Sequence, residues 1–102
     1  MTYRVIYGPT FRDHLREHVQ YLHDNHVSQA VMDAWYNRLF DLVDGLDEWP
    51  NRFPVDEEQS NLAGRETRKL NVGKYLVFYQ VDDEAKQVHL VGFRHGARRR
   101  KT

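Results

Sequence analysis

Histidine has the most chemical options of the residues in this chain, because its side chain titrates near neutral pH and also binds metals. Four of the six histidines fall in one short stretch, at His14, His18, His23 and His26. His14 and His18 are one helical turn apart, a spacing found in metal sites, but no further ligands follow at a recognised spacing. Both flank an apolar stripe, so we interpret the stretch as an exposed helix face and predict no metal and no cofactor.

A further histidine, His95, lies near the C-terminus and could act as a general acid or base. It has no carboxylate partner nearby in sequence, and we interpret it as a structural residue at the end of the last strand. Cysteine is absent, which excludes disulfides, thiol nucleophiles and cysteine-based zinc sites. The two tryptophans, Trp35 and Trp49, are expected to be a core residue and a loop anchor.

Cationic side chains gather in the second half of the chain, although the net charge is zero. Residues 1–63 carry 5 basic and 11 acidic side chains, a net charge of −6, and residues 64–102 carry 10 and 4, a net charge of +6. The C-terminal part is therefore a candidate surface for nucleic acid or for an acidic protein segment; alternatively, the two halves neutralise each other within the fold. The candidate binding residues there are Arg65, Arg68, Lys69, Lys74, Arg98, Arg99 and Arg100.

The elements that must position these side chains fit one domain, because 102 residues supply a single core. Hydrophobic periodicity predicts a strand over 2–7, a helix from a Thr10 cap to Asp24 and a second helix from a Ser28 cap to about Leu46. A long loop over 47–64 follows, and such loops are often functional. Three strands are then predicted, and their ranges are 66–72, 75–81 and 87–93.

These elements predict an α+β fold: an N-terminal strand, a two-helix hairpin and a three-stranded antiparallel meander, with the helices packed on one face of an antiparallel sheet. The strand over 75–81 is apolar on both faces, so we expect it to be central. One domain spans 1–102, and residues 95–102 are expected to form a basic, mobile tail. No apolar run could span a bilayer and no export signal precedes the domain, so we expect a cytoplasmic protein with no membrane partner.

The second predicted helix has two apolar stripes where docking on a small core needs one. One stripe contains Trp35, and the other contains Met32, Tyr36 and Phe40. The extra stripe either covers the neighbouring helix or meets a partner chain. We therefore include Met32, Tyr36 and Phe40 among the candidate binding residues.

The order of elements and a set of short segments resemble the RelE/ParE toxin superfamily of bacterial type II toxin–antitoxin modules, over essentially the whole chain. The segments are Gly8-Pro9, Trp49-Pro50, Thr67-Arg68-Lys69-Leu70, Val72-Gly73-Lys74-Tyr75, Val77-Phe78-Tyr79-Gln80-Val81-Asp82 and His95-Gly96-Ala97-Arg98. The resemblance implies the toxin of a plasmid-stabilisation module, which forms a hetero-oligomer with a cognate antitoxin. It also implies that no cofactor is required.

Within this superfamily, resemblance to the RelE branch would imply a ribosome-dependent endoribonuclease. Such an enzyme uses Lys and Arg side chains on the sheet and a tyrosine near the C-terminus. Lys69 and Arg98 match that pattern, and with His95 they are the catalytic candidates if the chain cuts RNA. Thr67 stands where a second lysine is expected, Leu76 replaces an arginine, and no tyrosine follows Arg98. The resemblance is therefore closer to the ParE branch, whose members act on DNA gyrase.

Three functions follow from the resemblance. The first is an inhibitor of DNA gyrase that is not an enzyme. The second is a metal-independent endoribonuclease whose partners are the ribosome and messenger RNA. The third is a degenerate homologue that binds antitoxin but has lost toxicity, and only a growth assay distinguishes it from the first.

Overall fold

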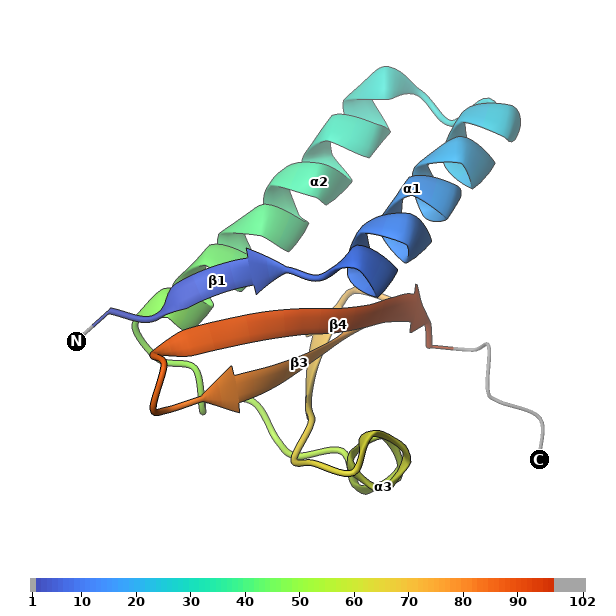
Figure 1. Ribbon diagram of the computed structural model, residues 1–102. Coiled ribbons are helices and arrows are strands. Elements are labelled where there is room, and N and C mark those ends of the chain that lie inside the picture. The colour runs from blue at the N-terminus through green and yellow to red at the C-terminus, as the bar shows by residue number, and fades with distance from the viewer. Residues whose placement is uncertain (1, 97–102) are drawn as a thin grey trace.

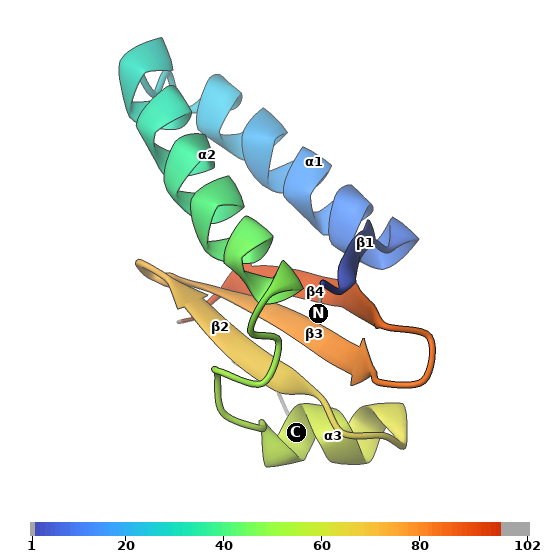
Figure 2. The same cartoon turned by 90° about the vertical axis from the view of Figure 1, so that its left-hand side faces the viewer.

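The computed structural model describes residues 2–96 as one sheet with helices on both of its faces (Figures 1 and 2). The elements in chain order are β1 (Arg4–Tyr7), α1 (Pro9–Asp24), α2 (Gln29–Asp44), the 3-10 turn η1 (Gly45–Asp47), α3 (Glu57–Ala63), β2 (Arg68–Val72), β3 (Tyr75–Asp82) and β4 (Gln87–His95). The predicted α+β class, helical hairpin and three-stranded meander are confirmed. Between residues 2 and 96, no helix is both long and apolar enough to cross a membrane.

The sheet has the strand order β1-β4-β3-β2, so β3 lies in its interior as predicted. The meander pairs are antiparallel, but β1 runs parallel to β4, with Val5 opposite Val88. The sheet is therefore mixed and not wholly antiparallel, because the helical hairpin carries the chain back before the meander starts. At the end of β1, the Gly8 N–H donates to the Leu90 carbonyl at 3.0 Å, and a Cβ on Gly8 would lie 2.6 Å from that oxygen. Only glycine allows this close approach.

The helical hairpin of α1 and α2 covers one face of the sheet (Figure 2). The predicted Thr10 cap is wrong, because α1 is preceded by Gly8 and starts with Pro9, whose fixed φ suits a first helical position. The predicted Ser28 cap is confirmed, since its Oγ accepts a hydrogen bond from the Val31 N–H at 3.3 Å. The core between hairpin and sheet is formed by Phe11, Leu39, Val43, Leu46, Leu70, Val72, Val77, Tyr79, Val88, Leu90 and Phe93.

The second apolar stripe of α2 packs largely within the molecule. Met32 is 8% exposed, and Tyr36 and Phe40 are half-buried. The rings of Tyr36 and Phe40 stack with their centroids 5.8 Å apart, and the Phe40 centroid lies 6.1 Å from that of Tyr7 of β1. The structure therefore favours intramolecular packing of the stripe. Met32, which we had included among the candidate binding residues, is buried and offers no surface to a partner.

The segment predicted as a loop contains α3 on the sheet face opposite the hairpin (Figure 2). The Asp56 carboxylate caps this helix by accepting from the Gln59 N–H at 2.9 Å, and Gly64 ends it with φ at +72°. Asp56 followed by Gln59 three residues later is a capping pattern that could have predicted the start. A seven-residue helix without a buried side chain has no hydrophobic period, which is why it was missed.

Candidate functional site

The sheet face opposite the hairpin carries Lys69, the central residue of the predicted site. Leu70 and Val72 of β2 are buried in the core under the hairpin. Because successive side chains of a strand point to opposite faces, Lys69, which directly precedes Leu70, points to the other face. Lys69 lies opposite Phe78 in the β2–β3 pair, and Leu76 lies opposite Arg94 in the β3–β4 pair. This face therefore brings together Lys69, Leu76 and Arg94.

Both cations on this face are paired with acidic side chains next to or within α3. Lys69 Nζ is 3.7 Å from Asp56 Oδ2, and Arg94 Nη2 is 4.0 Å from Glu58 Oε1. The Arg94 guanidinium also lies over the Phe78 ring, 5.2 Å from its centroid. The positive charge here is thus paired with negative charge within the molecule. This partly supports the alternative that the two halves of the chain neutralise each other within the fold.

Two positions that we expected to be cationic in an endoribonuclease have structural roles or apolar character. Thr67 is 1% exposed, and its N–H donates to Ser60 Oγ at 2.8 Å. Its hydroxyl accepts from Gln80 Nε2 at 3.1 Å, so the backbone of Thr67 binds α3 while its side chain binds the neighbouring strand β3. Leu76 is half-buried and contributes no charge.

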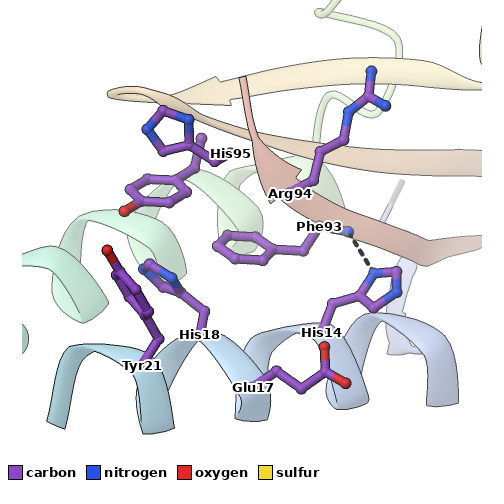
Figure 3. A pocket seen from close by; sticks show the side chains of 8 residues that line it. His14, Glu17, His18, Tyr21, Phe93, Arg94 and His95 are labelled. Atoms are coloured by element: carbon purple, nitrogen blue, oxygen red, sulfur yellow. Dashed lines mark hydrogen bonds between the residues drawn. The ribbon is translucent and has the colours of Figure 1, made fainter. Parts of the chain in front are cut away.

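His95 lies on the hairpin side of the sheet, away from Lys69. Its ring contacts Tyr75 edge-on at 5.0 Å, and both line a cleft of about 540 Å³ between α1 and the end of β4 (Figure 3). Lys69 and His95, two of the candidates if the chain cuts RNA, therefore lie on opposite faces of the sheet and do not meet. Arg98, the third candidate, lies outside the described residues.

The cleft is an aromatic pocket that we did not predict from the sequence. The residues that line it are His14, Glu17, His18, Tyr21, Tyr75, Phe93, Arg94 and His95. Within the cleft the rings of Tyr75 and Phe93 stack with their centroids 5.5 Å apart, and the centroid of the His18 ring lies 4.4 Å from that of Tyr75. His14 Nδ1 accepts a hydrogen bond from the Phe93 N–H at 3.4 Å, and Figure 3 shows the Arg94 side chain turned away from α1.

This cleft corrects our interpretation of the histidines on α1. His14 is exposed as expected, but His18 is half-buried in the aromatic cluster, 5.0 Å from Trp35. The spacing of His14, His18 and Tyr21 places all three along one side of α1, and this was the signal available in the sequence. Among residues 2–96, no group of three or more His, Cys, Asp or Glu side chains is arranged to hold a metal ion.

The predicted basic patch is divided between different parts of the surface. Arg68 Nη1 donates to the Phe53 carbonyl at 2.6 Å and so fastens the loop before α3, whereas the neighbouring Lys69 points to the opposite face. Arg65 and Lys74 are exposed, beyond the ends of α3 and β2 respectively. Arg99 and Arg100 lie with Arg98 outside the described residues.

A family model for the ParE toxin of type II toxin–antitoxin systems (parDE) matches residues 5–100. The chain belongs to the ParE toxin family. This ParE-family toxin is also similar in fold to two solved structures. One is the toxin–antitoxin complex RelBE2 from Mycobacterium tuberculosis, at 22% identity and a TM-score of 0.60, with 93% of this chain and 99% of that chain covered. The other is the RelE–RelB complex from the archaeon Pyrococcus horikoshii, at 21% identity and a TM-score of 0.61, with 97% and 100% covered. No curated protein matches the chain.

Proposed function

We propose that this ParE-family toxin inhibits DNA gyrase by binding it, and that it does not cut RNA. The observation that carries the proposal is the state of the sheet face opposite the hairpin, where Asp56 and Glu58 neutralise Lys69 and Arg94. Leu76 and the buried Thr67 occupy the positions where further cations would be expected. We propose accordingly that the protein acts in the cytoplasm, where gyrase and DNA are found.

Cleavage of RNA without a metal needs a base for the 2′-hydroxyl, an acid for the leaving oxygen and cations that stabilise the charged transition state. Each well-placed stabilising group contributes about 3–4 kcal/mol. On this sheet face, the described candidates for that role are Lys69 and Arg94, and both already have carboxylate partners. His95 cannot complete a site with Lys69 from the other side of the sheet.

We also propose that a cognate antitoxin neutralises the toxin in a hetero-oligomer that serves plasmid stabilisation. Both similar structures are complexes of a toxin with its antitoxin. The net charge of +6 over residues 64–102 suits an acidic antitoxin segment. The half-buried rings of Tyr36 and Phe40 offer apolar surface for the same partner, and hydrogen exchange of α2 with and without antitoxin would test that contact.

The deciding experiment gives purified toxin to gyrase with relaxed plasmid DNA and, in parallel, to ribosomes translating a messenger RNA. We expect loss of supercoiling or trapped cleaved DNA, and intact messenger RNA. Leu76→Arg should not create RNA cleavage, because the other stabilising groups are still missing. Codon-specific cuts by the unmodified protein, lost in Lys69→Ala or Arg98→Ala, would contradict the proposal and assign RelE-like endoribonuclease activity.

A further inference from the structure

The loop after η1 presents an exposed tryptophan next to an arginine. Trp49 was expected to anchor the loop, but its side chain is 63% exposed. The Arg52 guanidinium contacts two rings, 5.6 Å from the centroid of Trp49 and 4.9 Å from that of Phe53. We call the surface formed by Trp49, Arg52 and Phe53 the Trp49 platform.

The backbone of the Trp49 platform is fastened to the sheet from its buried side. The Tyr79 hydroxyl donates to the Pro50 carbonyl at 2.7 Å, and Arg68 Nη1 donates to the Phe53 carbonyl at 2.6 Å. The Lys69 N–H donates to the Pro54 carbonyl at 3.0 Å. A partner would therefore meet a loop that is already ordered, and little conformational entropy would be lost on binding.

The residue types of the Trp49 platform are those that dominate protein interfaces. Trp and Arg are the residues most enriched among interface positions that carry the binding energy. An indole that is 63% exposed contributes little to the core, so stability of the toxin does not explain its place. The geometry instead suits insertion of the indole into an apolar pocket of another protein.

The charge around the Trp49 platform identifies the partner's chemistry. Asp44, Asp47 and Glu48 lie within the five residues before Trp49, and Arg52 is the only basic residue in the range 44–55. The Arg68 guanidinium also reaches this loop from β2, but it is largely buried and pairs with Glu66 at 3.3 Å. An acidic antitoxin segment would be repelled here and attracted to the C-terminal half, whereas a basic protein surface would be attracted.

We propose that the Trp49 platform is the docking site for the toxin's protein target, a basic surface with an apolar pocket that receives the indole of Trp49. This inference rests on the proposed function, because it requires that the toxin acts by binding a protein. It goes further by assigning target and antitoxin to surfaces of opposite charge.

The test compares Trp49→Ala with Leu62→Ala, which truncates an apolar residue that is 57% exposed on α3. Each variant and the unmodified toxin are induced in bacteria, and growth arrest is measured against inducer dose. Loss of an interface residue of this type weakens target binding about 30-fold. We therefore expect Trp49→Ala to need a correspondingly higher dose and Leu62→Ala to resemble the unmodified toxin.

Binding of the cognate antitoxin by each purified variant is the check on folding, and we expect it to change less than about threefold because the antitoxin binds elsewhere. If Trp49→Ala fails this check, Glu48→Lys is used instead. It keeps the indole but reverses the charge directly before Trp49, so it should also weaken binding to a basic target surface. Full toxicity of Trp49→Ala or of a folded Glu48→Lys, or no toxicity of the unmodified chain, would overturn the proposal. Toxicity that depends on Trp49 while supercoiling is unaffected would support the Trp49 platform and reject gyrase as the target.

Discussion

At the scale of single residues, Tyr79 joins the sheet to the loop that carries Trp49. The side chain is fully buried, and its hydroxyl donates to the Pro50 carbonyl at 2.7 Å. Burial raises the pKa of the Tyr79 hydroxyl above its ordinary value of 10.0. Tyr79→Phe should lower the free energy of unfolding by about 1 kcal/mol, because the Pro50 carbonyl loses its partner. Urea denaturation at pH 7 measures this loss.

The raised pKa also predicts a pH dependence for the same residue. The folded state holds the Tyr79 proton more tightly than the unfolded state, so this contribution to stability is complete below pH 10 and is lost as the pH rises through the folded pKa. The free energy of unfolding should therefore fall less steeply above pH 10 in Tyr79→Phe than in the unmodified protein. Tyr21→Phe is the control, because Tyr21 is 53% exposed on α1, and it should match the unmodified protein within about 0.5 kcal/mol at pH 7. Equal alkaline slopes for Tyr79→Phe and the unmodified protein would contradict this account.

At the scale of elements, α3 depends on Asp56, which both caps the helix and pairs with Lys69. Asp56→Ala should lower the free energy of unfolding by about 1 kcal/mol, because the first turn of α3 loses its cap. Asp56→Asn keeps a capping oxygen and removes only the charge, so it should cost a few tenths of a kcal/mol at this partly exposed pair. Urea denaturation and amide exchange of Gln59 measure the two effects. Equal losses in the two variants would show that the ion pair matters more than the cap.

At the scale of the whole molecule, the separation of charge between the two halves should steer the antitoxin. Replacing Arg98, Arg99, Arg100 and Lys101 by glutamine should lower the association rate with an acidic antitoxin and flatten its salt dependence. The dissociation rate and the circular dichroism spectrum should change little. Glutamine at Arg12 and Arg16 on α1 is the control for loss of positive charge in the acidic half. Stopped-flow mixing measures these rates, and an unchanged association rate at low salt would contradict steering by the tail.

The strands and the helical hairpin could be predicted because each is encoded by a local pattern. A short run that is apolar on both faces predicts β3, and a serine cap followed by apolar residues at helical spacing predicts α2. These patterns depend on neighbours along the chain, so they can be recognised without the fold. The short segments shared with the toxin superfamily supported the same order of elements, which the structure shows. The match of residues 5–100 to the ParE toxin family confirms the resemblance itself.

The candidate site could be predicted only in part, because the sheet decides which side chains meet. The sequence by itself supplied the charge split between the two halves, and its resemblance to the toxin superfamily supplied Lys69, Thr67 and Leu76 as the decisive positions. Only tertiary structure placed His95 across the sheet from Lys69, since strand pairing between distant segments sets the face of each residue. It likewise decided that α3 supplies carboxylates to Lys69 and Arg94, and that Trp49 stays exposed, because these outcomes depend on contacts between segments far apart in the chain.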